Sequence, residues 1–179
     1  MKYVAFLRAI NVGGHIVKMD HLRSLFESLG FANVETFIAS GNVIFDSKTR
    51  SIAALEKKIE KQLQAGLGYE VKTFIRTLDE IADVIRDESF NTTELEAPGN
   101  ILYIGFMSAT SEGAAIKKLS SLVDDVNDFR LREREVFWLR RTKVGVSQYS
   151  GGIIEKTLKT PITFRNSTTV KKILAKYLR

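Results

Sequence analysis

Segments with the spacing of strands and of helices follow one another in a fixed order along the first half of this chain. That order restricts the fold more than any single motif does. Tyr3 to Ile10 is an apolar run that predicts a buried strand, and apolar residues then recur at helical spacing from Met19 to Leu29, before Gly30. Two β-rich runs, Val34–Ala39 and Asn42–Asp46, come next and are separated by a turn signal. The chain therefore begins with the order β-α-β-β.

The next two segments complete a known pattern. One apolar helix face is predicted from Ile52, Leu55, Ile59 and Leu63. Tyr69 to Ile75 predicts a further strand, so the full order is β-α-β-β-α-β. This is the order of a ferredoxin-like sandwich, in which helices cover one face of an antiparallel sheet. Thr77-Leu78-Asp79-Glu80 has the pattern of a capping box and predicts an extra helix through Ile85.

A polar stretch separates this half from the next. Asp87 to Asn100 contains Pro98-Gly99 and has neither helical nor strand periodicity, which is typical of a linker. We therefore expect a first subdomain at residues 1–88, a linker at 89–100 and a second subdomain with a C-terminal helix at 101–179.

The second half repeats the order of the first. Its predicted elements are a strand at Ile101–Phe106, a helix at Ala114–Leu122, a hairpin of Val126–Arg132 with Val136–Arg141, a helix at Ile153–Leu158, a strand at Ile162–Phe164 and a terminal helix containing Val170, Ile173, Leu174 and Tyr177. The predicted fold class is α+β, with two tandem ferredoxin-like subdomains and extra helices. The halves either share one sheet or leave open sheet edges, through which the chain would form a homodimer.

Composition excludes several classes of protein. The chain has no cysteine, which removes disulfide and thiolate chemistry and fits a reducing cytoplasm. No segment approaches the roughly 20 apolar residues that cross a bilayer, so we expect a cytoplasmic protein without a membrane partner. The net charge is +6. Basic and acidic residues balance over residues 1–90, so the positive excess lies in residues 91–179, where it favours polyanionic partners.

The first strand runs into a glycine pair flanked by cations. Arg8, Asn11, Gly13, Gly14 and Lys18 are candidates for holding an anion, because glycine allows close backbone approach and cations pair with phosphate or carboxylate. The motif matches neither the phosphate loop nor the dinucleotide fingerprint. The structural alternative is a tight turn in which Asn11 bonds to nearby backbone and Arg8 pairs with a local acid.

A second candidate lies between two predicted strands. Ser40, Gly41 and Asn42 place a hydroxyl and an amide at a chain reversal. The serine lacks the flanking glycines of a nucleophile elbow, and a catalytic triad would need His15 or His21 to reach it. We therefore group these residues with the ligand-binding candidates and assign no catalytic residue.

A third candidate precedes the terminal helix. Asn166 or Ser167 is predicted to cap that helix, and Arg165 stands beside its first N–H groups, where an anion would be stabilised. Capping alone accounts for Asn166 and Ser167, so Arg165 is the residue that indicates binding. If Arg8 and Arg165 face one another, they form a basic cleft between the two halves.

Basic and aromatic side chains also gather on the predicted hairpin: Arg130, Arg132, Trp138, Arg140 and Arg141. Trp138 and Arg140 share one face of a strand, an arrangement that suits stacking on bases and contact with phosphates. The hairpin is thus an alternative, nucleic-acid-binding site. In the structural interpretation, the arginines pair with Glu133 and Glu135.

Four segments together carry a resemblance: Phe6-Leu7-Arg8-Ala9-Ile10-Asn11-Val12-Gly13-Gly14, Met19-x-x-Leu22, Ser40-Gly41-Asn42-Val43-Ile44-Phe45, and Thr163-Phe164-Arg165-Asn166 with Thr169-Val170. They resemble a bacterial domain-of-unknown-function family, number 1697. The resemblance implies two related α+β subdomains of ferredoxin-like type and no assigned activity. This chain departs from the family pattern at Ser167, where tryptophan is frequent, and at Ala9, where glycine is frequent.

These observations favour a protein that holds a small anionic or phosphorylated ligand in a basic cleft between its subdomains. A nucleic-acid-binding module that uses the hairpin is the first alternative, and a structural or dimerising role is the second. The run Asp124-Asp125-x-x-Asp128 lacks the glycine and glutamate of an EF-hand loop, so neither a metal nor another cofactor is predicted. Whether the protein is an enzyme stays open.

Overall fold

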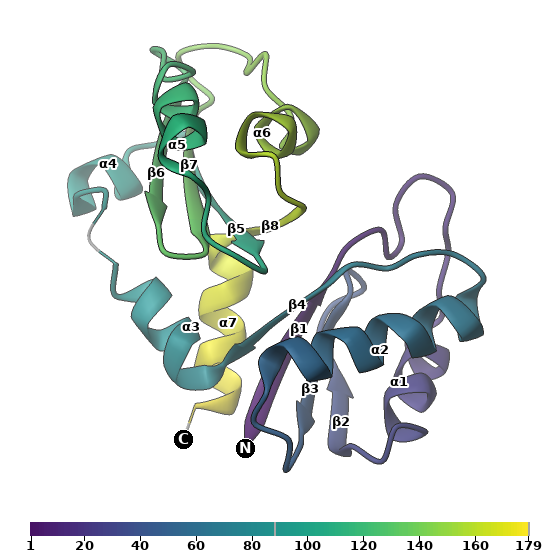
Figure 1. Ribbon diagram of the computed structural model, residues 1–179. Coiled ribbons are helices and arrows are strands. Elements are labelled where there is room, and N and C mark those ends of the chain that lie inside the picture. The colour runs from purple at the N-terminus through teal and green to yellow at the C-terminus, as the bar shows by residue number, and fades with distance from the viewer. Residues whose placement is uncertain (88, 179) are drawn as a thin grey trace. The chain divides into compact units, whose positions relative to one another are not determined.

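Two four-stranded antiparallel sheets organise the chain, which is a mixed α and β fold. The computed structural model describes residues 1–87 and 89–178, and these include seven helices (Figure 1). Two compact units are separable, Met1–Ile81 (unit 1) and Ala82–Arg179 (unit 2), and each contains one of the sheets.

Unit 1 contains β1 (Lys2–Leu7), α1 (Met19–Glu27), β2 (Ala32–Thr36), β3 (Asn42–Asp46), α2 (Ile52–Leu67) and β4 (Thr73–Thr77). The strand order is β2-β3-β1-β4, so β1 is an inner strand that pairs with β3 and β4. Helix α3 (Leu78–Ile85) follows β4 directly and extends past the end of the unit. Thr77 and Glu80 bond reciprocally to each other's N–H at its start, which confirms the predicted capping box.

Both helices of unit 1 cover the same face of its sheet (Figure 1). Their apolar residues join one core with the inward side chains of the strands, and they include Leu22, Leu25, Phe26, Leu55, Ile59 and Leu63. Helix α2 begins where the Ser51 hydroxyl accepts from the Ala54 N–H, and it ends at Gly68, whose φ is +81°. The strands therefore end in loops whose positions are fixed by a well-packed core.

Unit 2 contains α4 (Thr92–Glu96), β5 (Asn100–Met107), α5 (Gly113–Ser120), β6 (Asn127–Arg132), β7 (Glu135–Arg141), α6 (Gly151–Leu158), β8 (Ile162–Asn166) and α7 (Ser167–Tyr177). Its strand order is β6-β7-β5-β8, the same arrangement as in unit 1. Helices α5 and α6 pack on the sheet over a core that includes Met107, Leu119, Phe129, Trp138, Ile154 and Leu158. Helix α7 contacts β5 and β8.

Two segments differ from the sequence-based expectation. The strand predicted at Tyr69–Ile75 is β4 at Thr73–Thr77, because pairing with β1 begins only at Thr73 opposite Leu7. The stretch 89–100 contains α4, whose capping box is made by Asn91 and Glu94. This helix is short and has no buried residue, which explains why no apolar periodicity marked it.

Candidate functional site

Three loops of unit 1 are bonded to one another at one end of its sheet. The Asn11 side chain connects two of them, because its Nδ2 donates to the carbonyl of Ala39 (2.8 Å) and its Oδ1 accepts from the Val17 N–H (2.7 Å). The hydroxyl of Tyr69, in the α2–β4 loop, donates to the carbonyl of Ala9 (3.3 Å). The predicted first and second groups of candidate residues thus lie on adjoining loops.

The backbone of this region is strained. Ala9, Asn11 and Ile38 all have left-handed φ angles, of 61°, 55° and 59°. Such a conformation costs a non-glycine residue on the order of 1–3 kcal/mol, and a β-branched residue such as Ile38 rarely adopts it. Residues of this kind cluster at functional sites, where surrounding contacts hold them in place. Asn11 supplies those contacts here, so it acts as a positioning residue.

The glycines of the region fall into two kinds. Gly13 and Gly14 have φ angles of +59° and +86°, and a Cβ on either would meet no atom within 4 Å. Within residues 1–87 and 89–178, neither of their N–H groups has a hydrogen-bond acceptor. Gly41 is close-packed instead, since a Cβ there would lie 2.9 Å from the Cβ of Ile10. The Gly13–Gly14 backbone is therefore open to a ligand, whereas Gly41 is structural.

Two cations flank this backbone. Arg8 is half-buried, and its backbone N–H donates to the carbonyl of Lys72 (2.9 Å). Lys18 is exposed, and no acid in the described part of the chain forms an ion pair with it. The start of α1 is less suited to an anion than the sequence suggested, because Asp20 already occupies its first turn and pairs with Arg23 at 3.0 Å.

The residues of the second candidate group mainly support the loop. Asn42 is fully buried, and its Nδ2 donates to the carbonyl of Phe37 (2.9 Å) and to the Ser40 hydroxyl (2.9 Å). His15 stacks on Tyr69, with ring centroids 4.0 Å apart. These contacts place the Asn42 amide beside the Ser40 hydroxyl, whereas the His15 imidazole lies against Tyr69.

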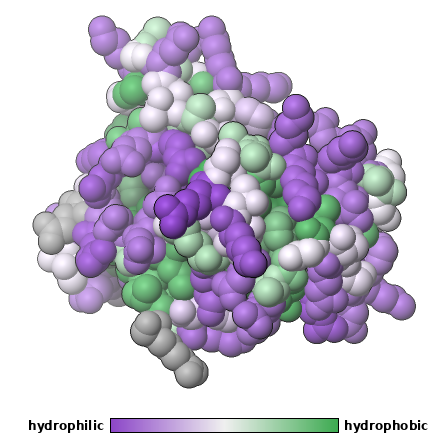
Figure 2. All heavy atoms as spheres, turned by 60° about the horizontal axis from the view of Figure 1, so that its bottom comes forward, coloured by the Kyte–Doolittle hydropathy of each residue, from purple (hydrophilic) through white to green (hydrophobic). Residues whose placement is uncertain are grey.

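Exposed apolar side chains gather on the same loops. Hydrophilic side chains predominate on the face drawn in Figure 2, with smaller hydrophobic areas between them. On the loops at this end of unit 1, Val12, Ile16 and Ile38 are 57%, 89% and 53% exposed. An anion-binding loop with apolar neighbours suits a ligand that carries both a charged and an apolar part.

The third candidate group lies in unit 2. Arg165 is buried, and its Nη1 donates to the Thr163 hydroxyl (2.9 Å) and to the carbonyl of Phe164 (3.0 Å). Burial lowers the pKa of its guanidinium to about 10. Asn166 caps α7 by accepting from the Thr168 N–H (2.8 Å), as the sequence predicts. Arg165 is therefore a buried side chain that donates to its own strand, and its part in binding an anion stays a prediction.

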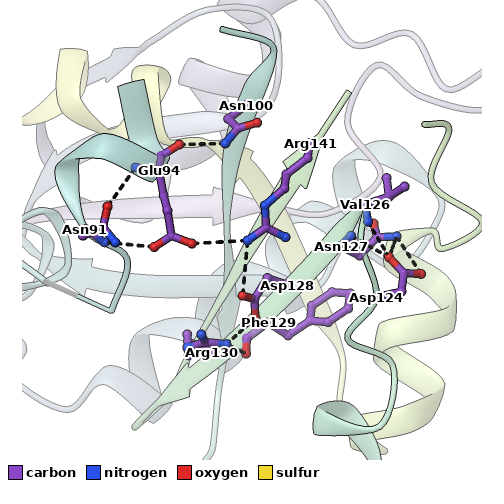
Figure 3. A network of polar contacts seen from close by, with 10 residues as sticks. All are labelled: Asn91, Glu94, Asn100, Asp124, Val126, Asn127, Asp128, Phe129, Arg130 and Arg141. Atoms are coloured by element: carbon purple, nitrogen blue, oxygen red, sulfur yellow. Dashed lines mark hydrogen bonds and ion pairs between the residues drawn. The ribbon is translucent and has the colours of Figure 1, made fainter. Parts of the chain in front are cut away.

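Most of the hairpin arginines form ion pairs inside unit 2. In Figure 3, Arg141 bridges Glu94 (3.2 Å) and Asp128 (3.5 Å), and Asp128 also pairs with Arg130. Arg132 pairs with Asp87 at 2.7 Å. The sequence had suggested neighbouring glutamates as partners, but these acids come from α4, β6 and the chain after α3. Ion pairs within the unit thus engage three of the four arginines predicted to contact nucleic acid.

Trp138 lies in the core of unit 2. Its side chain is 5% exposed, it stacks on Phe129 with centroids 5.7 Å apart, and its Nε1 donates to Asn127 Oδ1 (3.1 Å). The expectation that Trp138 offers a surface for stacking on bases is therefore wrong. Alternation along β7 turns this side chain toward α5 and α6, because the core of the unit lies on that side.

Two of the three acidic residues considered for metal binding, Asp124 and Asp128, form contacts within unit 2. Asp124 accepts from the N–H groups of Val126 (2.9 Å) and Asn127 (2.7 Å), as Figure 3 shows. Burial acts to raise the pKa of its carboxyl, but these hydrogen bonds outweigh burial and lower it. No cluster of three metal-ligating side chains is found among residues 1–87 and 89–178.

Stability is expected to depend on Asp124 at acid pH. Because its folded pKa lies below the unfolded value of about 4, its contribution is complete above that value and is lost as pH falls through the folded pKa. Asp124→Asn keeps an acceptor but cannot titrate, so its unfolding free energy should fall less than that of the wild type as pH is lowered from 4. Urea unfolding across this range measures the difference. Asp125→Asn, at an exposed neighbour, is the matched control variant.

Comparison with protein families identifies the relatives of this chain. The model of a family described as a protein of unknown function (DUF1697) matches residues 1–137. The chain belongs to this family. The match includes the unit 1 loops and the hairpin only as far as residue 137, within β7, so it ends before Trp138, Arg140 and Arg141. Arg165 and Asn166 also lie beyond it. No curated protein matches.

A solved structure has the same fold as this DUF1697 protein. A conserved bacterial protein from Streptococcus pneumoniae is similar with a TM-score of 0.75 and 23% identity, over 99% of this chain and 98% of that one. At this identity the likeness concerns the fold alone. No helix among the described residues has both the length and the apolar character needed to span a membrane.

Sequence reasoning missed two residues of interest. Tyr69 was placed inside a strand, although Gly68 before it marks the end of a helix and so indicates a loop. Arg76 is 1% exposed on β4, and its Nη1 donates to the carbonyl of Ile75 (2.8 Å). The sequence around Arg76 did not indicate that its side chain would be buried.

Proposed function

We propose that the loop end of unit 1 binds a small anionic or phosphorylated ligand. The main observation behind this proposal is the open Gly13–Gly14 backbone, whose N–H groups have no acceptor within the described residues. The Asn11 side chain holds this loop by its hydrogen bonds to Ala39 and Val17, and Asn11 and Ile38 both have left-handed φ angles. Backbone N–H groups in left-handed loops form concave sites that accept phosphate oxygens. Lys18, which forms no ion pair within the described residues, adds a positive charge at the end of the same loop.

Each residue of the proposed site has a defined part. The N–H groups of Gly13 and Gly14 donate to the anion, Lys18 supplies charge, and the Arg8 guanidinium offers paired donors. Asn11 maintains the loop without contacting the ligand. Participation of Arg165 and Asn166, and a cleft between the subdomains, stay predictions from the sequence.

Thermal unfolding with a ligand panel tests the proposal. A ligand at 100 times its Kd adds about 2.7 kcal/mol to the unfolding free energy, a shift that is readily measured. We expect a stabilising ligand among inorganic phosphate, nucleotides, sugar phosphates and carboxylates, and we expect Lys18→Gln to reduce the stabilisation. Lys57→Gln is the matched control, because Lys57 is also exposed but lies on α2. Stabilisation unchanged in Lys18→Gln and in Arg8→Ala contradicts the proposal.

The alternatives have less support. Nucleic-acid binding through the hairpin is disfavoured by the internal ion pairs of Arg130, Arg132 and Arg141. Dimerisation through β2 is disfavoured by the irregular register between Ala32 and Glu35, since such bulges protect an edge from pairing.

We also propose that each unit is a ferredoxin-like subdomain. The common strand order supports this assignment, because the third strand of each unit lies between the second and the first, and the fourth strand lies on the other side of the first. The subdomain limits 1–88 and 101–179 stay predictions.

A further inference from the structure

Arg140 differs from the other hairpin arginines whose contacts are described above. Its guanidinium carbon lies 5.8 Å from the ring centroid of Tyr103 and 5.3 Å from that of Trp138. It forms no ion pair or hydrogen bond with any side chain or carbonyl in residues 1–87 and 89–178. Its Nε is buried and lacks an acceptor, whereas its Nη groups are not buried. This guanidinium is thus held by aromatic rings and by no acid.

The sheet register brings a hydroxyl to the same place. On β5 and β7, Tyr103 pairs with Trp138, and Ile101 pairs with Arg140. Side chains two residues apart on a strand share a face, so the Tyr103 and Arg140 side chains project from the same side of the sheet. Within the described residues, the Tyr103 hydroxyl makes no hydrogen bond either. Two groups with unused donors therefore lie together in unit 2.

The Nε–H of Arg140 is buried without an acceptor among the described residues, whereas its Nη groups stay accessible to a ligand. A buried donor without an acceptor costs about 1–3 kcal/mol, and the cost is larger for a charged group. Arg141, whose side chain is mostly buried, avoids that cost by pairing with Glu94 and Asp128. Among the described residues, Arg140 makes cation–π contacts and no hydrogen bond or ion pair. Such contacts are worth about 2 kcal/mol when desolvated, and they leave the N–H donors in the guanidinium plane unused.

We propose that Arg140 and Tyr103 form a second anion site, which binds the phosphate group of a ligand. The rings fix the plane of the guanidinium, so its two Nη groups present a rigid pair of donors that matches two phosphate oxygens. The Tyr103 hydroxyl donates to a third oxygen. Three donors suit a tetrahedral phosphate better than a carboxylate, which has two oxygens. This site lies within unit 2 and does not depend on the function proposed for unit 1.

Arginine side-chain NMR tests the site directly. The Nε–H signal of Arg140, assigned by its loss in Arg140→Lys, is followed during titration of the full chain with inorganic phosphate. We expect a saturable shift, and an Arg140→Lys protein that binds phosphate at least tenfold more weakly by calorimetry. Tyr103→Phe keeps the ring and should weaken binding several-fold. Lys18→Gln should leave the Arg140 shift unchanged, which separates this site from that of unit 1.

A control variant and two control anions test whether the site is specific for phosphate. Arg132→Lys alters an exposed arginine that already pairs with Asp87, so its phosphate affinity should equal that of the wild type. Potassium chloride at matched ionic strength should give no saturable shift. An equal shift with chloride, an equal affinity for acetate, or an unchanged affinity in both Arg140→Lys and Tyr103→Phe overturns the proposal.

Discussion

Replacing Trp138 by alanine is expected to lower the free energy of unfolding by about 3–5 kcal/mol, the cost of deleting a large aromatic side chain from a packed core. The indole contacts Phe129, Tyr103 and Phe164, with ring centroids 5.6 to 5.7 Å apart. Its Nε1 also donates to Asn127, which would lose a buried partner. Urea unfolding monitored by circular dichroism measures the change.

A conservative variant separates packing from surface binding. Trp138→Phe keeps a ring between Phe129 and Phe164 but loses the Nε1 donor, so its cost should be well below that of alanine. Trp138→Phe keeps an aromatic ring and, once folded, should not change the affinity for single-stranded RNA at low salt. A Trp138→Ala protein of wild-type stability that loses RNA affinity would contradict the buried assignment and restore the nucleic-acid alternative.

The order of elements was predictable because it depends on local periodicity. Helix α2 was recognised from an apolar face that is buried as expected, and the hairpin of β6 and β7 was recognised from alternation around Glu133. The start of β4 was not predictable in this way. Val71 is apolar and buried like a strand residue, but it precedes the first pair with β1, and pairing depends on a partner distant in sequence.

The candidate residues were found more easily than their roles. Glycines before a cation mark the loop of unit 1, but the sequence does not show that Asn11 is engaged by Ala39, a residue 28 positions away. The hairpin arginines show the same limit. Arg132 and Arg141 pair with acids 45 and 47 positions away, whereas charge patterning identifies only near neighbours. Roles that depend on long-range contacts therefore required the structure.

Gly41→Ala is expected to destabilise unit 1 by about 2–5 kcal/mol, from two additive causes. Its φ of +72° costs an L-residue about 1–2 kcal/mol. The new Cβ would also lie 2.9 Å from the Cβ of Ile10 and 3.2 Å from that of Leu7, and overpacking of this kind typically costs about 1–3 kcal/mol. Gly13→Ala is the matched control, because its φ is +59° but its Cβ would meet no atom within 4 Å. Gly13→Ala should therefore lower the free energy of unfolding only by the cost of its positive φ, about 1–2 kcal/mol.

The same pair of variants tests how the loops support the proposed ligand. Leu7 donates its N–H to the carbonyl of Gly41 (2.8 Å), and Asn11 is bonded to Ala39 in the same loop, so a displaced Gly41 disturbs the tether of the glycine pair. Gly41→Ala should therefore reduce ligand-induced stabilisation without touching the ligand, and Asn11→Ala should reproduce that effect. Equal unfolding free energies for Gly41→Ala and Gly13→Ala would mean that the Ile10 contact relaxes at no cost. In that case the close packing of Gly41 against Ile10 would not be what positions the proposed ligand site of unit 1.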